Sequence, residues 1–326
     1  MKKFLLVDTP NMFWRSRYGS RGESFEKVGL TIHILFSCLK KSWDIQEFDH
    51  VVLAFDRKSW RKDVYAPYKA NRYVNLSEED VEANRVFFEA FDSVKNYFQE
   101  KTNCSVLEHD GLEADDIISW FIQQHPQDKH TIVSSDADFD QLLADNVSIY
   151  DGIDDTITTK SGVFDYRRKQ LTDKKTGKLK VPPDPEWSLF EKSIRGCTSD
   201  HIFSAYPGVR LKSTKSKTGL LEAFADKGKQ GFAWSSVMLQ KWVDHNGIEH
   251  RVIDDYKRNL SLVDLKNGQP EFIMLLLNDV IQKCQNPKKI PMIGFHFLKF
   301  CGKYQLTRLS EQSKAFVQFL SKSYPA

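Results

Sequence analysis

The stretch Gly111-Leu112-Glu113-Ala114-Asp115-Asp116-Ile117-Ile118, followed by Thr131-Ile132-Val133-Ser134-Ser135-Asp136-Ala137-Asp138, decides the fold. The first piece predicts the start of a helix, on which Glu113 and Asp116 are three residues apart and share a face. The second predicts a short buried strand that delivers Asp136 and Asp138 at its carboxyl end. A helix that leads into such a strand is half of a βαβ unit, so the carboxylates are expected to gather at one rim of a sheet.

The clustered carboxylates indicate a metal site. They repel one another unless cations neutralise them or some carboxyls stay protonated. Ligands that are all oxygen suit Mg²⁺ or Mn²⁺ better than Zn²⁺. The alternative is that Glu113, Asp115 and Asp116 are ordinary first-turn residues, favoured by the positive end of the helix dipole. The pair Asp136-x-Asp138, directly after an apolar strand, favours the metal site.

Two further apolar strands end in aspartate: Phe4–Val7 before Asp8, and Val51–Phe55 before Asp56. Unbroken apolar strands are typical of a parallel sheet covered by helices on both faces, where ligands lie beyond the carboxyl ends of the strands. One such aspartate is usually a turn or cap residue. Three of them beside an acidic helix start predict an α/β fold with a largely parallel central sheet flanked by helices, and aspartates converging on one point.

A basic and aromatic stretch follows the second strand, from Trp60 to Tyr73. Cations interleaved with aromatic rings suit a single-stranded nucleic acid, whose phosphates pair with the cations and whose bases stack on the rings. The alternative is a solvated loop. The cations expected to contact nucleic acid are Arg61, Lys62, Lys69 and Arg72. Ser77 then opens a long helix in a capping-box pattern, with apolar residues at helical spacing.

The second half of the chain carries another basic element. A polar stretch, Thr172–Lys180, and the prolines after it predict an exposed hairpin or loop and a boundary between domains 1–185 and 186–326. Beyond a helix at Glu186–Arg195, a glycine-bounded turn within residues 205–225 could hold phosphates without reading sequence. An ordinary lysine-rich surface loop is the alternative. The residues of this turn expected to bind DNA are Gly208, Arg210, Lys212, Lys215 and Lys217.

Composition excludes several classes of protein. At 326 residues the chain can bury a large core, and no apolar run approaches the length of a membrane span. Lys2-Lys3 is followed by four apolar residues before Asp8, which does not resemble a signal peptide. Five scattered cysteines without metal-type spacing fit a reducing, cytoplasmic compartment. The net charge of +3 is too small to diagnose a polyanionic partner.

Together these motifs resemble the 5′-nuclease superfamily of flap endonucleases, polymerase 5′-nuclease domains and phage 5′→3′ exonucleases, above all the ribonuclease H of T-even phages and its T-odd relatives. The resemblance covers residues 6 to about 265. The motifs that carry it are Leu6-Val7-Asp8, Ala54-Phe55-Asp56, Trp60-Arg61-Lys62, Tyr68-Lys69-Ala70-Asn71-Arg72, Leu112-Glu113-Ala114-Asp115-Asp116 and Ser134-Ser135-Asp136-Ala137-Asp138-Phe139.

The resemblance implies a PIN/5′-nuclease-like fold and two-metal hydrolysis of phosphodiester bonds, with Mg²⁺ ions about 4 Å apart and Mn²⁺ able to substitute. It assigns ligands of the first ion, direct or through water, to Asp8, Asp56, Glu113, Asp115, Asp116 and Asp136. It assigns the second ion to Asp138 and Asp200. Lys69 and Arg72 resemble the basic pair that polarises the scissile phosphate. A helical arch (about 57–100) would pass a 5′ single strand, and a C-terminal helix–hairpin–helix-like motif would grip duplex DNA.

The chain departs from the family pattern at two places. Members usually carry Gly-Asp-x-x-Asp where this chain has Gly196-Cys197-Thr198-Ser199-Asp200. Since a neutral thiol adds no negative charge and a thiolate is too soft for Mg²⁺, the second ion is expected to bind weakly. Alternatively, Cys197 is a small buried residue. The hairpin also lacks the compact Gly-x-Gly turn, because Arg210–Thr218 fills it.

Two functions are consistent with these observations. The first is a structure-specific 5′ nuclease with exonuclease, flap endonuclease and ribonuclease H-like activities that removes primers and flaps during DNA replication or repair. The second is a relative that binds DNA junctions with weakened catalysis because of Cys197. The expected partners are branched or nicked DNA and RNA–DNA duplex, with a replication or single-strand-binding protein as a further candidate. The protein is expected to be a monomer away from membranes, in the host cytoplasm if a phage encodes it.

Overall fold

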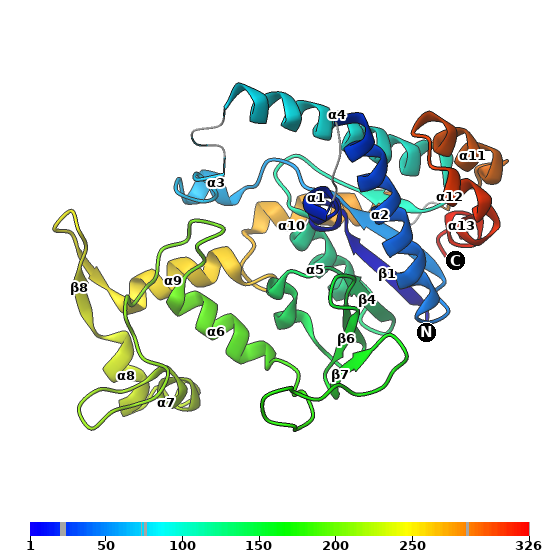
Figure 1. The fold of residues 1–326 in the computed structure, drawn as a ribbon. Helices are drawn as coiled ribbons and strands as arrows, with labels where there is room; N and C mark the ends of the chain where they lie inside the picture. The colour runs from blue at the N-terminus through cyan, green and yellow to red at the C-terminus, as the bar shows by residue number, and fades with distance from the viewer. Residues whose placement is uncertain (20–23, 73, 75–76, 285–286, 326) are drawn as a thin grey trace. The chain divides into compact units, whose positions relative to one another are not determined.

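The computed structural model describes residues 1–19, 24–72, 74, 77–284 and 287–325. The chain forms two compact units (Figure 1). The first contains residues 1–59, 75–182 and 271–326, and the second contains residues 60–74 and 183–270. No helix in the described part of the chain is both long enough and apolar enough to cross a lipid bilayer.

A seven-stranded sheet, counted over the described residues, forms the centre of the first unit. Its order is β3-β2-β1-β4-β5-β6-β7. The first five strands of this order pair in parallel, and β6 and β7 extend the sheet antiparallel, so the predicted largely parallel sheet is confirmed. The strands are β1 Lys3–Asp8, β2 His50–Ala54, β3 Ser105–Leu107, β4 Lys129–Val133, β5 Val147–Asp151, β6 Thr156–Thr159 and β7 Gly162–Asp165.

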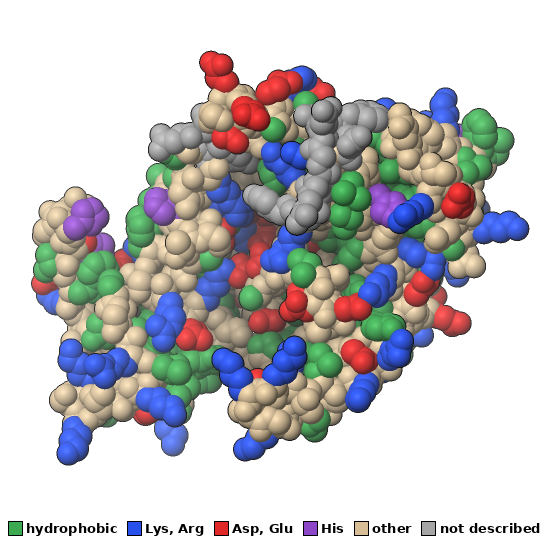
Figure 2. Space-filling model, in the orientation of Figure 1, with side chains coloured by type: hydrophobic (Ala, Val, Ile, Leu, Met, Phe, Trp, Pro, Cys, Tyr) green, Lys and Arg blue, Asp and Glu red, His purple; other side chains and the backbone are tan. Residues whose placement is uncertain are grey.

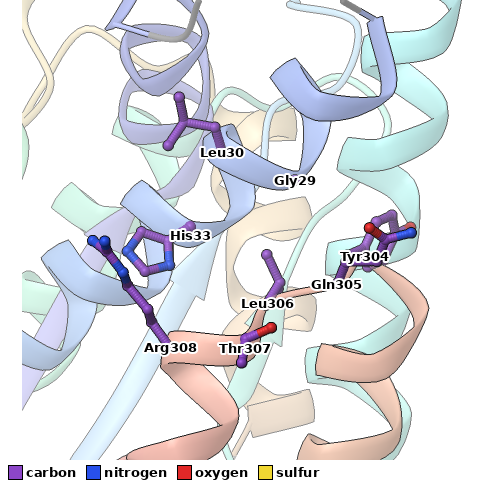
Figure 3. Close-up of a pocket in the computed structure, with 8 residues that line it drawn as sticks. All are labelled: Gly29, Leu30, His33, Tyr304, Gln305, Leu306, Thr307 and Arg308. Atoms are coloured by element: carbon purple, nitrogen blue, oxygen red, sulfur yellow. The ribbon is translucent and has the colours of Figure 1, made fainter. Parts of the chain in front are cut away.

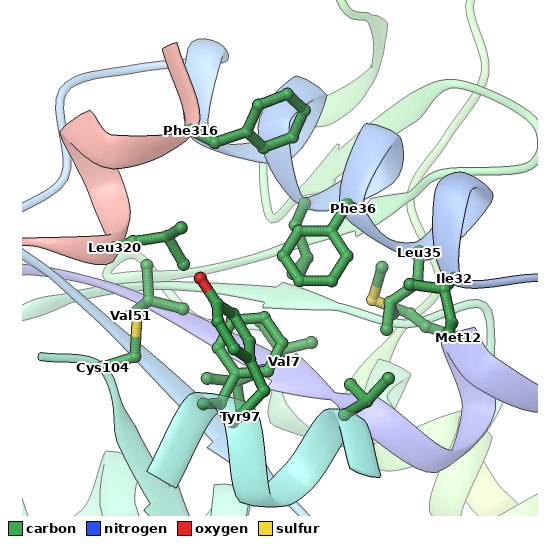
Figure 4. Packing of buried hydrophobic residues seen from close by; sticks show 14 of the residues in the cluster. Val7, Met12, Ile32, Leu35, Phe36, Val51, Tyr97, Cys104, Phe316 and Leu320 are labelled. Carbon is green, nitrogen blue, oxygen red and sulfur yellow. The ribbon is translucent and has the colours of Figure 1, made fainter. Parts of the chain in front are cut away.

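Helices cover both faces of this sheet because alternate residues of its strands point to opposite sides. Leu5 and Val7 of β1 belong to the large core of Figure 4, whereas Phe4 packs edge-on against Phe121 at a centroid distance of 5.0 Å. The helices that contribute to the core of Figure 4 are α1 Thr9–Gly19, α2 Ser24–Asp44, α4 Glu78–Lys101, α11 Ile293–Lys303, α12 Thr307–Glu311 and α13 Ser313–Leu320. The opposite face of the sheet, where Phe4 packs against Phe121, is covered by α5 Ala114–Gln124 and α10 Glu271–Cys284.

The C-terminal helices return to the first unit, which differs from the predicted division at residues 185 and 186. Figure 1 shows α12 and α13 beside α2, which they contact. Phe297 and Phe316 are fully buried and stack on each other with centroids 5.0 Å apart. Residues 293–320 therefore complete the core to which β1 and β2 also contribute. Because their aromatic side chains are buried in that core, they belong to the first unit.

The second unit is mainly helical and has its own apolar clusters, one of them around Phe190, Trp234 and Tyr256. It also contains residues 60–74, which the sequence had placed in the first domain. Its elements are α3 Arg61–Val64, α6 Pro185–Arg195, α7 Leu220–Ala225, α8 Phe232–Met238, β8 Lys241–Val243, β9 Glu249–Arg251 and α9 Val252–Val263. The helix predicted at Glu186–Arg195 is therefore present, capped by Asp184.

The expected arch falls on both units and partly outside the described residues, since residues 73, 75 and 76 are not described. Ser77 caps α4 in the predicted capping box. Phe87, Val94 and Phe98 of α4 are buried in the core, whereas Val81 near its start is 56% exposed. The second half of α4 is thus a core helix, and a role for residues 57–100 as an arch stays a prediction.

Candidate functional site

Three aspartates lie at the carboxyl ends of three adjacent strands. Asp8 is the last residue of β1, and β1 lies between β2 and β4, which precede Asp56 and Asp136. Parallel neighbours in a sheet are about 4.8 Å apart, so ends of this kind can share one site. The charges of both Asp56 and Asp136 act on Asp8. The strand order therefore brings together three residues that are distant in sequence.

Asp8 is the most strongly perturbed of these carboxyls. Its side chain is buried, Ser134 Oγ donates to its Oδ2 at 2.7 Å, and the backbone N–H of Asn11 donates to its Oδ1 at 3.3 Å. Burial, followed by repulsion from Asp56, raises the pKa of Asp8 from 3.8 to about 7, although the hydrogen bond from Ser134 opposes this. An ionised Asp8 therefore needs a neutralising cation.

The start of α5 brings three more carboxylates to the first unit. Glu113, Asp115 and Asp116 each offer an oxygen that lies within 4.8 Å of the other two. Ser59 Oγ donates to Glu113 Oε2 at 2.8 Å, and the N–H of Glu113 donates to Asp116 Oδ2 at 3.3 Å. Asp56 Oδ1 accepts the N–H of Ala114 at 2.8 Å, which ties the end of β2 to the start of α5.

The burial of this group bears on the helix-dipole alternative. Glu113 is 5% exposed and Asp116 is fully buried. A first-turn carboxylate that serves the helix dipole gains about 0.3–1 kcal/mol at the surface, whereas burying a charge costs several kcal/mol unless it is paired. Oxygen-only donors that lie close together, two of them buried, fit a hard divalent cation. The side chains present are therefore compatible with Mg²⁺ or Mn²⁺.

The segment after β4 supplies the remaining carboxylates. A 3₁₀ helix, η1 Ala137–Leu142, begins after Asp136, whose Oδ1 accepts the N–H of Asp138 at 3.0 Å. Burial, together with the charges of Asp138 and Asp136, raises the pKa of Asp140 to about 6. Sequence reasoning missed Asp140, although the repeat Asp136-x-Asp138-x-Asp140 was available as a signal. It also missed the hydroxyl donors Ser59 and Ser134.

A cavity of about 300 Å³ adjoins these strand ends. Its lining includes Ser134 and Ser135 after β4, Asp151 at the end of β5, and Asn11 and Arg15 on α1. Asn11 Oδ1 accepts from Ser135 Oγ at 2.9 Å, and Arg15 Nη2 donates to the carbonyl of Ser135 at 3.4 Å. Room for a ligand therefore exists beside the carboxyl ends of β4 and β5, although Asp8, Asp56 and Asp136 are not among the residues that line it.

Another hollow in the first unit, of about 380 Å³, lies between α2 and residues 304–308 (Figure 3). Its described lining contains Arg308 and His33 but no carboxylate. Burial, and then the charge of Arg308, lowers the pKa of His33. This hollow is consequently not a cation site.

The basic stretch of the second unit is folded rather than a solvated loop. Arg61 is 1% exposed, and its Nε donates to the carbonyl of Leu262 at 2.7 Å, while its guanidinium lies over the ring of Trp60 at 4.9 Å. Trp60 and Tyr68 are each 3% exposed. The predicted DNA contact of Arg61 and the predicted base stacking on Trp60 and Tyr68 are therefore incompatible with this structure, because all three side chains are buried. Lys62 remains exposed.

Lys69 and Arg72 both approach Asp200. Arg72 Nη2 lies 2.9 Å and Lys69 Nζ 3.9 Å from Asp200 Oδ1. The N–H of Lys69 donates to the carbonyl of Asp200 at 2.8 Å. Lys69 and His201 adopt left-handed backbone conformations, with φ of 52° and 55°. Such residues cost roughly 1 kcal/mol each and persist where the surroundings fix them, so this contact is a tightly determined part of the second unit.

The basic turn after α6 is exposed. Gly208, Arg210, Lys212, Lys215 and Lys217 all lie at the surface, and Figure 2 shows Lys and Arg gathered over the region of α7 and α8. Gly219 is the N-cap of α7, and a Cβ there would lie 2.3 Å from the carbonyl carbon of Lys212, which explains the glycine. The helices on either side are α6 and α7, with residues 196–219 between them, so the turn is longer than a compact helical hairpin.

Comparison with known proteins identifies the relatives of the chain. The family described as "5'-3' exonuclease, N-terminal resolvase-like domain" matches residues 3–174. DNA polymerase I of Rhizobium leguminosarum is 29% identical over 263 residues, which cover 76% of this chain and 21% of the polymerase. A 5'-3' exonuclease of Aquifex aeolicus is 27% identical over 174 residues, which cover 50% of this chain and 56% of the relative. The chain thus spans from a fifth to about half of the length of these two relatives.

A flap endonuclease of Escherichia phage T5 is 28% identical over 289 residues, which cover 86% of this chain and 90% of the relative. Solved structures of the phage T5 enzyme share the fold. The T5 D15 protein crystallised with metal ions has a TM-score of 0.59 at 19% identity, covering 86% of this chain and 99% of that one. A complex of the T5 D15 flap endonuclease with DNA and metal ions has a TM-score of 0.56 at 21% identity, covering 86% and 96%.

Proposed function

Because the chain belongs to the 5'-3' exonuclease family, we propose that it is a divalent-metal-dependent 5′ nuclease with 5′→3′ exonuclease and flap endonuclease activity. The observation that carries the proposal is the set of buried carboxylates in the first unit. Burial and the negative charges of Asp56 and Asp136 raise the pKa of Asp8 to about 7. Glu113 and Asp116 are buried in a separate three-carboxylate group. Such a concentration of negative charge is useful to a nuclease when cations occupy it.

The proposed cofactor is Mg²⁺, bound as two ions, with Mn²⁺ able to substitute. Bound divalent ions would supply charge stabilisation to the phosphoryl oxygens and lower the pKa of an attacking water. The chain's own carboxylates would hold them: Ser134 keeps Asp8 oriented, and Ser59 does the same for Glu113. Support comes from structures of the phage T5 nuclease that were crystallised with metal ions, one of them with zinc.

The proposed substrates are branched or nicked DNA and primer RNA in RNA–DNA duplex, cleaved during replication or repair. Lys69 and Arg72 would place positive charge on the substrate phosphate, where charge develops in the transition state. The exposed lysines of the turn at 210–217 would bind duplex phosphates regardless of sequence. One relative is a flap endonuclease, and one structure of it is a complex with DNA.

We further propose that the protein acts as a monomer in the cytoplasm, the host's if a phage encodes it, with a replication or single-strand-binding protein as a candidate partner. The five cysteines are free thiols, which suits a reducing compartment. A role limited to DNA binding is disfavoured. Buried carboxylates without a metal would repel a phosphate backbone, so a binding module would gain nothing from them.

The test is cleavage of a 5′-labelled flap and of a 5′-labelled RNA–DNA hybrid with Mg²⁺, and again with excess chelator. Products should appear with Mg²⁺ and be absent with chelator. Asp116→Asn, which removes a buried charge at nearly constant volume, should lower the rate by about a hundredfold. Glu191→Gln is the matched control, because its partly exposed carboxylate pairs with Arg195 on the same helix. Equal cleavage in chelator, or full activity of Asp116→Asn, would refute the proposal.

A further inference from the structure

Asp200 is surrounded by cations of its own unit. Arg72 Nη2 and Lys69 Nζ lie 2.9 and 3.9 Å from its Oδ1, and Lys192 Nζ lies 4.0 Å from its Oδ2. The thiol of Cys197 donates to the same Oδ2 at 3.6 Å. The side chain of Asp200 is 14% exposed. Both carboxylate oxygens are therefore already engaged by cations and by a thiol of the second unit.

The backbone around Asp200 holds it in this position. Cys197 and Ile202 exchange two backbone hydrogen bonds, of 2.9 and 2.8 Å, which close residues 197–202 into a tight loop. Gly196 opens the loop with φ of 74°, and a Cβ there would lie 2.3 Å from the carbonyl oxygen of Ile202. The backbone position of Asp200 is therefore fixed by this loop.

The same loop is interlocked with the basic segment. Besides the bond from the N–H of Lys69 to the carbonyl of Asp200, His201 Nδ1 lies 2.9 Å from the carbonyl oxygen of Pro67. The left-handed residues Lys69 and His201 are the ones that make these contacts. Strained backbone that is held by its neighbours is typical of functional positions. The loop and the segment therefore form one rigid element.

This environment does not fit a ligand of a divalent ion. The family pattern supplies two carboxylates from this loop. Here one of the two positions is Cys197, whose thiol donates a hydrogen bond to Asp200. Mg²⁺ binds at 2.0–2.1 Å from its oxygen ligands. On Asp200 it would approach three cations that already lie within 4.0 Å of the carboxylate. Their repulsion opposes binding there.

We propose that Asp200 is a positioning residue, which holds Lys69 and Arg72 in the geometry for the substrate phosphate, and that it is not a ligand of a second metal ion. This inference rests on the proposed function. The two cations act on the substrate, and Asp200 acts through them. Cys197 also helps to position these cations, because its thiol orients the carboxylate of Asp200 without adding a second negative charge that would compete for them.

The first test counts metal ions. Mn²⁺ binding to wild type and to Asp200→Asn is measured by electron paramagnetic resonance, without substrate. The number of ions bound and their affinities should agree within about twofold, because the carboxylate that is removed binds none. Loss of one ion, or affinity weaker by about tenfold, would overturn the inference. This readout does not depend on activity.

The second test is a double-mutant comparison. Asp200→Asn should lower the single-turnover rate at saturating substrate by about tenfold or more, with KM little changed. In a Lys69→Ala, Arg72→Ala background, adding Asp200→Asn should cost less than about twofold, because its effect passes through the missing cations. Glu191→Gln, on the same unit, is the control for removing an ion pair. A full additional loss in the double background would mean that Asp200 acts independently of the cations.

The outcomes separate the inference from the function on which it rests. If wild type cleaves flaps with Mg²⁺ and Asp200→Asn loses an ion, the proposed function stands and the positioning role fails. If wild type cleaves neither a flap nor an RNA–DNA hybrid, the proposed function fails, and the role of Asp200 in cleavage fails with it. Circular dichroism of each variant against wild type identifies any loss of activity that comes from misfolding.

Discussion

Replacing Asp8 with asparagine should make the metal-free protein more stable at pH 8 and should abolish metal-dependent cleavage. Burial and the charges of Asp56 and Asp136 raise the pKa of Asp8 from 3.8 to about 7. The folded protein therefore binds this proton more tightly than the unfolded chain does. The stabilising contribution of the protonated carboxyl is complete below pH 4 and is lost as the pH rises to about 7.

The size of the effect follows from that pKa difference. At about 1.4 kcal/mol for each pKa unit, ionising Asp8 costs the folded protein roughly 4 kcal/mol at pH 8. An asparagine resembles the protonated carboxyl: its oxygen can accept the N–H of Asn11, and its amide can donate to Ser134 Oγ. Because an amide does not reproduce the hydrogen bonds of a protonated carboxyl perfectly, we expect a gain of about 2–4 kcal/mol in the free energy of unfolding. That is a large fraction of the stability of an ordinary domain.

The measurement is urea unfolding in chelator at pH 8 and at pH 4.5, for wild type and Asp8→Asn. The variant should be more stable at pH 8 and show a much smaller advantage at pH 4.5, where Asp8 of the folded protein stays protonated and so carries no buried charge. Asp145→Asn is the matched control, since Asp145 is 88% exposed and its pair with Lys160 is at the surface. It should change stability by less than about 0.5 kcal/mol at either pH.

Two results would refute this reasoning. If Asp8→Asn destabilises the metal-free protein equally at both pH values, then ionised Asp8 costs the fold nothing and the carboxylates do not strain one another. If Asp145→Asn gives the same pH-dependent gain, then total charge and not the site is responsible. Adding Mg²⁺ provides an internal check, because it should stabilise wild type at pH 8 far more than it stabilises the variant.

Three further outcomes follow from the structure. Ser134→Ala removes the 2.7 Å hydrogen bond to Asp8 and should move the midpoint of the pH–rate profile up by about one unit, whereas Ser135→Ala should not; superimposable profiles would contradict this. Lys69→Ala should lower kcat with little change in KM, and an intact single-turnover rate with poor affinity would reduce it to a binding contact. Lys215→Ala should weaken DNA binding regardless of sequence and reduce the salt dependence by about one ion, which a salt titration measures directly.

The sequence predicted the sheet and the place of its aspartates because both depend on local patterns. An apolar run such as Phe4–Val7 can be buried on both faces whatever surrounds it, and a parallel sheet brings the ends of its strands to one edge. The residues that support the aspartates were harder to predict. Ser134 and Ser59 are ordinary serines in the sequence, and their importance comes from the buried carboxylate that each contacts.

Arg61 shows why the basic stretch was harder to interpret. In the sequence it is one cation among several next to aromatic residues, which is typical of nucleic-acid binding. In the structure it donates to the carbonyl of Leu262, 201 positions along the chain, and its guanidinium lies over the ring of Trp60. Nothing local distinguishes a guanidinium that is buried against a distant carbonyl from one that is exposed to a phosphate. Lys62, its neighbour, is exposed.

Asp8 and Asp200 show the same difficulty for carboxylates, and the difference between them is the charge of their neighbours. Asp8 lies among other carboxylates, so its ionised form is costly and a divalent ion would relieve the repulsion. Asp200 lies among three cations, which already neutralise it and repel a further cation. Those cations come from two separate segments, residues 69–72 and α6, so no spacing rule could have placed them around Asp200. Two aspartates that match one family pattern therefore have opposite surroundings, other carboxylates in one case and the cations of its own unit in the other.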